Sequence, residues 1–336
     1  MQKIVIVFTL ISSFLLQTSF AAEIDSVTPR KVKLENSFTL INTIFNQRLQ
    51  EGIQKANARQ AYIPDIIDGD NGCNEQVLYS ELRKAIFQSF TASWGLKGYD
   101  LDKQLRRLLA RQSYALSLND SIYRDIDYIE GFSLNLKELS DVVNINGHLV
   151  GLDKLGHLFA EGWKYFELSH FEGQNIKQAL EWGRQREAGK FGYRTTGIFS
   201  FADLVSNYNG MRFWNKILLK KGDPLKGALA NFFNKPYVSC EIQFIASIKN
   251  KKITKAWEFN SQFNLSDYID GSWDEANNCN SYADPIIEQK VTLRIKNVDP
   301  DFSCPYITEQ CLEAKEKYGD YAKYVLHPRC LIVTRE

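Results

Sequence analysis

The chain has 336 residues, of which 44% are hydrophobic, and its 41 basic and 40 acidic residues nearly balance. A chain without an excess of positive charge lacks the basic surface typical of nucleic-acid binding, so we expect no nucleic-acid partner. A chain of this length exceeds one comfortable hydrophobic core, which predicts two packed subdomains.

Residues 1–21 have the pattern of a secretory signal peptide. Lys3 supplies a short positive region, an apolar run follows over 4–16, and Ala21 precedes the expected cleavage site. The run is shorter than the roughly 20 apolar residues of a membrane span, although a retained anchor is the alternative. We therefore expect an exported protein, periplasmic or secreted, with no transmembrane segment after signal cleavage.

The even number of cysteines in an exported chain predicts disulfide bonds. Five of the six follow residue 235, which predicts a helical domain over 22–235 and a Cys-rich C-terminal subdomain over 236–336. We expect Cys73 to be paired and most later cysteines to be cross-linked among themselves. The pairing itself does not follow from the spacing. The cysteines are Cys73, Cys240, Cys279, Cys304, Cys311 and Cys330.

Apolar residues at helical spacing predict most of the secondary structure. The Asn146-Gly147 pair between alternating apolar residues predicts a β-hairpin over 142–150, because both turn residues must adopt positive φ. The segment 242–257 reads either as two strands turning at Asn250-Lys251 or as a broken helix, and 62–74 reads as a loop. Helices are predicted over 36–59, 75–90, 101–110, 153–168, 175–188, 200–220, 286–295 and 308–318.

These elements predict a mainly α fold: a multi-helical bundle with a small β-hairpin and a disulfide-bonded C-terminal region. Asp153 and His157 lie one turn apart on one of the predicted helices. A carboxylate that accepts from an imidazole fixes its tautomer and raises its basicity, so His157 is a candidate general base or metal ligand. Alternatively, Asp153 is a first-turn acid of the helix and His157 a core residue bonded to it.

Ser200 and Asp203 begin another predicted helix with the spacing of a capping box. Asn207 follows one turn later, and Gly210 lies inside the helix although both are poor helix formers. We expect either a close approach of another helix here or a polar contact that needs the amide, with Asp203 and Asn207 on one polar edge. Glu187 lies at a helix C-terminus, where a carboxylate is unfavourable without a partner such as a metal, Lys154 or His157.

The segment from about 153 to 210 resembles the core of the YfiM-type predicted lipoproteins and, more distantly, of the VanZ-like membrane proteins. The shared blocks are D-K-x-x-H, a charged residue followed by Glu, and F-S-F-x-D-L-x-x-N-x-x-G. The resemblance implies a polar cluster built from three helices in a cell-envelope protein, although here the helices carry more charges. The matching residues are Asp153, Lys154, His157, Arg186, Glu187, Ser200, Asp203, Leu204, Asn207 and Gly210.

VanZ-like proteins are associated with glycopeptide tolerance, which implies envelope lipid or glycan as the partner. The leading hypothesis is therefore an exported cell-envelope protein acting as a hydrolase on such a substrate. Its cofactor is not identified by the sequence; a divalent metal would have Asp153, His157 and Asp203 as ligands. The catalytic residues would be His157, Asp153, Glu187, Asp203 and Asn207.

The alternative is a non-catalytic periplasmic structural or binding protein, in which the same side chains form a buried polar network. Exposure separates the two hypotheses, because a catalytic cluster must open to a cleft. A further acidic segment, Trp273-Asp274-Glu275 with Asp267, Asp270 and Asp284 nearby, has the oxygen ligands of a calcium site. It lacks an EF-hand spacing, so we interpret it as a solvated loop held by disulfides.

Overall fold

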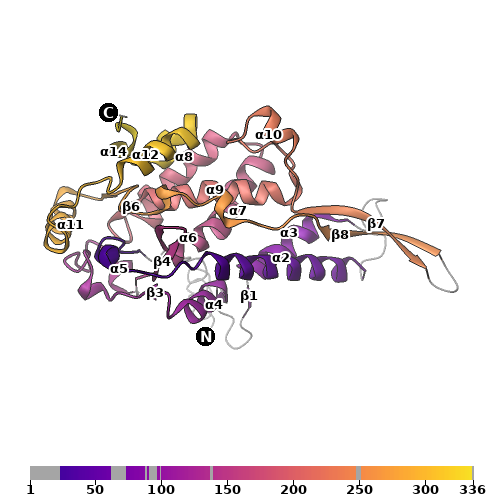
Figure 1. The fold of residues 1–336 in the computed structure, drawn as a ribbon, viewed down its shortest axis with the longest axis horizontal. Coiled ribbons are helices and arrows are strands. Elements are labelled where there is room, and N and C mark those ends of the chain that lie inside the picture. The colour runs from indigo at the N-terminus through magenta and orange to yellow at the C-terminus, as the bar shows by residue number, and fades with distance from the viewer. Residues whose placement is uncertain are drawn as a thin grey trace, which may run out of the picture.

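The computed structural model describes residues 23–61, 73–87, 89–90, 97–98, 100–136, 139–246 and 251–334. The predicted signal peptide, most of the predicted loop over 62–74, and Asn250 of the proposed turn lie outside the described residues. The described part of the chain is mainly helical, with short antiparallel sheets, as predicted (Figure 1).

The longer helices lie close to the residue ranges that the apolar spacing predicts. They are α2 (Phe38–Ala61), α3 (Glu75–Ile86), α4 (Asp100–Leu109), α5 (Phe132–Leu136), α6 (Leu152–Gly156), α7 (Gly162–His170), α8 (Ile176–Arg186), α9 (Phe201–Leu218), α10 (Ala228–Phe232), α11 (Pro285–Val298), α12 (Thr308–Tyr318), α13 (Ala322–Val325) and α14 (Pro328–Leu331).

Two predicted helices contain an irregular turn. The helix expected over 153–168 is α6 and α7 joined by a π-helical turn at His157–Glu161, and α8 continues into a π-helical turn at Glu187–Phe191. Such turns insert an extra residue and occur frequently at functional sites. The helix expected over 75–90 ends at Ile86, because residues 89–90 form a short strand instead.

The strands form four small antiparallel sheets. The pairs β1–β2, β6–β9 and β7–β8 stand apart from the three-stranded sheet β3–β4–β5. The strands are β1 (Ser89–Phe90), β2 (Lys97–Gly98), β3 (Ser113–Tyr114), β4 (Val142–Ile145), β5 (His148–Gly151), β6 (Ile198–Ser200), β7 (Val238–Ala246), β8 (Lys251–Phe259) and β9 (Asn280–Tyr282).

The predicted hairpin is confirmed as β4–β5. Its turn residues Asn146 and Gly147 have φ of 53° and 93°, the positive values that made this dipeptide a turn signal. Val143 faces Val150 across the ladder, and both side chains are buried. The hairpin therefore sets the position at which α6 begins.

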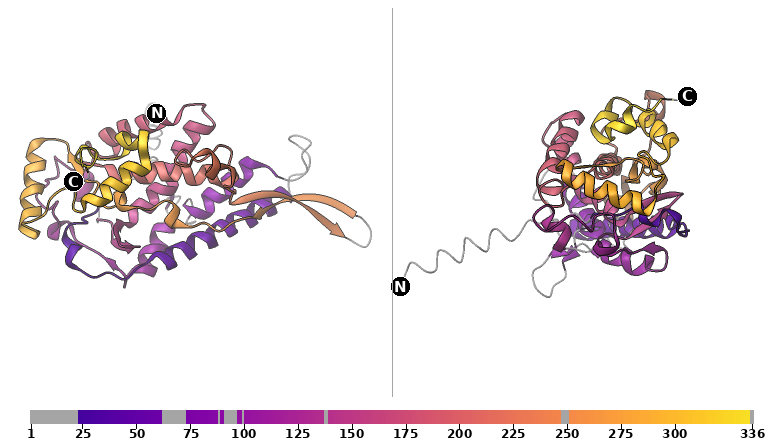
Figure 2. Two further views of the ribbon diagram at one scale, coloured as in Figure 1. Left: turned by 45° about the horizontal axis from the view of Figure 1, so that its top comes forward. Right: turned by 90° about the vertical axis from the view of Figure 1, so that its left-hand side faces the viewer.

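The ambiguous segment 242–257 is a strand pair, not a broken helix. In β7–β8, Val238 pairs with Phe259 and Ala246 with Lys251, and the long ribbon extends away from the helical body (Figures 1 and 2). At its base, the side chain of Asn57 on α2 forms two hydrogen bonds with the backbone of Trp257, at 2.8 and 2.9 Å. These bonds attach the ribbon to α2.

Helix α9 lies at the centre of the molecule (Figure 1). Nearly every side chain between Phe201 and Asn215 is buried, because other helices surround it. The main hydrophobic core extends from Ile41 on α2 to Cys330 on α14 and so includes residues on both sides of the predicted boundary at 235. The division into two subdomains stays a prediction.

All six cysteines form disulfide bonds, as predicted. Cys73 pairs with Cys240 at the start of the β7–β8 ribbon, and Cys279–Cys304 and Cys311–Cys330 cross-link the C-terminal region. Cys304 and Cys311 therefore pair with two different segments and not with each other. Among the described residues, no helix combines the length and apolar character needed to cross a membrane.

Candidate functional site

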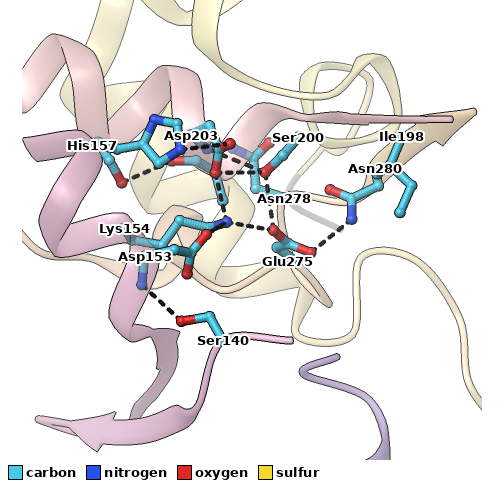
Figure 3. A network of polar contacts seen from close by, with 12 residues as sticks. Ser140, Asp153, Lys154, His157, Ile198, Ser200, Asp203, Glu275, Asn278 and Asn280 are labelled. Carbon is cyan, nitrogen blue, oxygen red and sulfur yellow. Dashed lines mark hydrogen bonds and ion pairs between the residues drawn. The ribbon is translucent and has the colours of Figure 1, made fainter. Parts of the chain in front are cut away.

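The predicted polar residues of α6 and α9 meet inside the bundle (Figure 3). Asp153 enters α6 directly after β5, where its backbone N–H donates to Ser140 Oγ at 3.0 Å. His157 follows as the first residue of the π-helical turn and points toward α9. Asp153, His157 and Asp203 each offer a ligand atom, and these atoms lie within 4.8 Å of one another.

His157 contacts α9 through both ring nitrogens. Its Nε2 lies 3.0 Å from Asp203 Oδ2, and its Nδ1 lies 3.1 Å from Asn207 Oδ1. Burial lowers the pKa of His157, but the charge of Asp203 and its hydrogen bond outweigh burial and raise that pKa to about 10. A doubly protonated imidazolium, which donates from both nitrogens, fits these two acceptors.

Lys154 is the residue that joins the cluster, and its side chain is 0% exposed. Its Nζ lies 2.7 Å from Asp153 Oδ2, 2.5 Å from Asp203 Oδ1 and 2.7 Å from Glu275 Oε1. Burial lowers the pKa of Lys154, but these three carboxylates outweigh it and hold that pKa well above its usual value. The ammonium group is therefore a permanent cation at the centre of the site.

Glu275 comes to the site from the C-terminal region, 72 residues beyond Asp203 in the printed sequence. Pairing of β6 with β9 places Ser200 opposite Asn280 and so brings the 271–280 segment against the start of α9. Glu275 Oε1 accepts from Ser200 Oγ at 3.0 Å, and Oε2 accepts from Asn280 Nδ2 at 2.7 Å (Figure 3).

The predicted capping box at the start of α9 is only half correct. Ser200 Oγ accepts from the backbone N–H of Asp203 at 3.2 Å, as expected. The side chain of Asp203 does not reach back to the Ser200 backbone, because Glu187 Oε1 accepts that N–H at 3.1 Å. Asp203 is released from capping and contacts the two cations instead.

Glu187 therefore has its partner in the backbone of Ser200. Burial, and next the charge of Asp203, raise the pKa of Glu187 to about 8. Asp203 is the opposite case: burial raises its pKa, but His157 and Lys154 outweigh burial and hold that pKa far below its usual value. Glu187 is thus the carboxyl group of the pair that holds a proton near neutral pH.

Further carboxyl groups lie at the edge of the cluster. Burial raises the pKa of Asp153 and of Glu275 above their usual values, although Lys154 opposes the shift in each. Burial, together with the charges of Glu275 and Asp203, raises the pKa of Glu23 well above its usual value. The cluster has more carboxyl groups than cations, so some of them remain protonated and neutral.

The centre of the cluster is closed to solvent. His157, Asp203, Asn207 and Glu187 are buried, with His157 the most exposed at 7%. A surface cavity of about 380 Å³ reaches Glu275 but is not lined by those four residues. The structure thus brings the five predicted residues together, but in a sealed site with one edge at a cavity.

Asp153, His157 and Asp203 do not fit a divalent metal while the imidazole of His157 is doubly protonated. A metal bound by Asp153, His157 and Asp203 needs a lone pair on an imidazole nitrogen, but both nitrogens face acceptor oxygens. The Lys154 ammonium already contacts both carboxylates and supplies the positive charge between them. One observation favours a bound cation: Asp153 Oδ1 is buried and has no hydrogen-bond partner among the described residues.

The interpretation of the acidic 267–284 segment as a solvated loop is wrong for 271–279, where every residue is buried, although Asp267 and Asp284 at its ends are exposed. Asp274 is buried and forms an ion pair with Arg30, while Glu275 belongs to the cluster. Asp270 accepts from Lys317 at 2.5 Å and from Tyr318 at 2.6 Å. These acids are paired within the protein, because the disulfide-linked C-terminal region packs over them.

Lys154 was expected only as a matching residue of the resemblance and as one possible partner of Glu187, and Glu275 only as part of a separate acidic segment. A signal for Lys154 was present, since a lysine beside Leu152 and Leu155 on a helix otherwise built for burial needs a buried partner. For Glu275, no local signal existed. Comparison of the chain with protein-family models, with curated proteins and with solved structures finds no match.

Proposed function

We propose that this chain is a non-catalytic structural or binding protein of the cell envelope, in which the cluster is a buried ionic network that fixes the bundle. The observation that carries the proposal is the fully buried Lys154 ammonium, which contacts carboxylates from α6, α9 and the 271–280 segment. Removing any partner leaves buried charge uncompensated, so the network favours one arrangement of the three segments.

Three disulfides support an exported location, because such bonds persist in oxidising compartments. This agrees with the predicted signal peptide and with the resemblance to YfiM-type and VanZ-like envelope proteins. The chemistry of the site supports a non-catalytic role, since a general base needs an unoccupied lone pair and access to a substrate. His157 has an acceptor at each nitrogen and lies away from the cavity.

A hydrolase acting on envelope lipid or glycan is the second candidate, and two observations favour it. Asp153 Oδ1 lacks a partner among the described residues, and Glu275 lines the cavity of about 380 Å³. In such an enzyme, Asp153, His157 and Asp203 would hold a divalent cation, which would polarise the substrate. Lys154 would first have to move away from both carboxylates, and His157 would have to lose a proton.

Replacement of Lys154 by Met tests the proposal. A buried network should lose about 3–5 kcal/mol of unfolding free energy, because Asp203 and Glu275 lose their shared cation. Lys164→Met is the matched control: Lys164 contacts Glu167 but its side chain is 37% exposed, and such surface pairs contribute only about 0–1 kcal/mol. Chemical unfolding of both variants provides the comparison.

Elemental analysis of the purified protein, with and without His157→Ala, separates the two candidates. The ionic network predicts no stoichiometric metal in either sample. One bound metal per chain, lost in His157→Ala while the melting midpoint is retained, would support the hydrolase instead. A Lys154→Met variant as stable as the parent protein would contradict the ionic network.

A further inference from the structure

A short segment after α9 presents large apolar side chains to solvent. Leu229, Phe232 and Phe233 are 74%, 80% and 71% exposed, and all three lie within five residues on and just after α10. We call these three residues the apolar tip. Single exposed apolar residues are ordinary on a protein surface, but a cluster that includes two adjacent phenylalanines indicates an interaction site.

The tip stands on a well-ordered support of hydrogen bonds. Asn231 Oδ1 accepts from the backbone N–H of Asp223 at 2.7 Å, and its Nδ2 donates to the carbonyl oxygens of Asp223 and Lys226 at 3.0 and 2.8 Å. Asp223 is itself held by Arg212 at 2.9 and 2.8 Å. The polar side chain of α10 therefore faces inward, and this arrangement directs the apolar side chains outward.

The residues around the tip are basic. Four lysines occur between 219 and 236, and Asp223, the only acid there, is consumed by its ion pair with Arg212. Lys220 is exposed but forms an ion pair with Glu75, whereas Lys221 and Lys235 are exposed and Lys226 is half-buried. An exposed apolar cluster surrounded by cations complements an anionic lipid surface, in which acyl chains lie beneath phosphate groups.

We propose that the apolar tip docks this protein onto an anionic lipid bilayer. The two phenylalanine rings and Leu229 enter the boundary between headgroups and acyl chains, and the surrounding lysines lie at the level of the phosphates. This inference rests on the envelope location proposed above but not on the role of the buried cluster. It names lipid as the partner of the envelope protein.

The size and position of the tip favour lipid over a protein partner. A stable protein interface involves about 20–30 residues on each side, whereas the tip has three apolar side chains. Helix α10 lies at the periphery of the molecule (Figure 1). Insertion into a fluid surface requires no complementary groove, only apolar groups that project past the charged groups around them.

Vesicle co-sedimentation tests the proposal on the full exported protein. We expect binding to vesicles of phosphatidylglycerol and phosphatidylethanolamine in equal parts, weaker binding as salt rises, and little binding to phosphatidylcholine alone. The variant Leu229→Ser/Phe232→Ser/Phe233→Ser should lose about a hundredfold in partitioning, since insertion depends on buried apolar area. Lys226→Ser/Lys235→Ser should lose about 25-fold in partitioning, at about fivefold per basic residue.

The matched control is Ile286→Ser/Leu293→Ser on α11, where both side chains are 61% exposed. It removes exposed apolar area elsewhere and should bind vesicles like the parent. The melting midpoint should stay unchanged in the tip variant, because its three side chains are already in solvent. Loss of binding with an unchanged midpoint therefore reports the surface and not the fold.

Three results would overturn the docking proposal. One is a parent protein that does not sediment with the anionic vesicles at low salt. Another is a tip variant that binds as tightly as the parent. The third is a parent dimer in sedimentation velocity that the tip substitutions convert to monomer, which would identify a second copy as the occupant. None of these results affects the Lys154→Met comparison, so failure here and failure of the proposed ionic network are distinguishable.

Discussion

Gly162 on α7 and Gly210 on α9 meet backbone to backbone where the two helices cross. A Cβ on Gly162 would lie 2.4 Å from Gly210 Cα, and a Cβ on Gly210 would lie 1.9 Å from the Leu158 carbonyl oxygen. The predicted close approach at Gly210 is therefore confirmed. The crossing brings His157, on the turn before α7, within reach of Asp203 and Asn207.

Replacement of Gly210 by Ala should destabilise the fold strongly. The new methyl group meets the backbone of the π-helical turn, which cannot rotate away as a side chain can. We expect a loss of about 3 kcal/mol or more in unfolding free energy, measured by chemical denaturation.

Gly156→Ala is the control for this substitution. Gly156 is exposed at the end of α6, and an added Cβ there meets nothing within 4 Å. Ala should stabilise that helical position by about 0.5–1 kcal/mol. Equal effects of the two substitutions would contradict a close crossing at Gly210.

Glu187 and His157 should make the protein less stable as pH rises from about 4.5 to about 10. Glu187 has a folded pKa of about 8 against an ordinary 4.5, and His157 about 10 against 6.5. Both groups bind a proton more tightly when folded, so their stabilising contributions are full at low pH and decline through those windows. Each contributes a slope of up to about 1.4 kcal/mol per pH unit.

Glu187→Gln should flatten this decline. The amide mimics the protonated carboxyl and can still accept the Ser200 N–H, so stability near pH 4, below the unfolded pKa of Glu187, should change little. Near pH 9 the variant should melt higher than the parent, which must then bury an additional negative charge. Glu181→Gln, at an exposed position of α8, should leave the profile unchanged; a Glu187→Gln profile parallel to that of the parent would count against a proton on Glu187.

His157→Ala should lower the unfolding free energy by about 3 kcal/mol, because Asp203 loses one of its two cationic partners inside the protein. His148→Ala provides the comparison: it removes an imidazole whose Nδ1 has no partner among the described residues. Thermal melts of both variants show whether the His157 imidazole contributes to stability. A His157→Ala midpoint equal to that of the parent would support a functional role for the imidazole.

Thiol titration of the unfolded, unreduced protein should find no free thiol, since all six cysteines are paired. After reduction, the same assay should find six. Four or more thiols before reduction would indicate a reducing compartment and would contradict the expected export.

Local sequence patterns predicted the elements on which the site stands. The apolar spacing located α12 at Thr308–Tyr318, and Asn146-Gly147 located the hairpin that precedes α6. Both features depend on interactions between residues a few positions apart. Helical spacing also placed Asp153 with His157, and Asp203 with Asn207, on one face of each helix. The expectation that the two pairs converge came from the resemblance, not from the spacing.

The centre of the site was decided by tertiary structure. Glu275 reaches Lys154 only because β9 pairs with β6 and the disulfide-linked C-terminal region packs over the start of α9. Glu187 displaces Asp203 from the predicted capping box for the same kind of reason, since its own helix ends beside Ser200. Such long-range contacts produce no periodic pattern in the amino-acid sequence.

Propensity and periodicity act over single turns, so local patterns were enough to predict most helices, the hairpin and the polar positions on the helix faces. The long-range packing of the chain places a lysine ammonium among those polar residues, closes the site, and leaves the apolar tip after α9 in solvent. Burial and charge compensation depend on every segment packed against a group, so they are properties of the assembled fold.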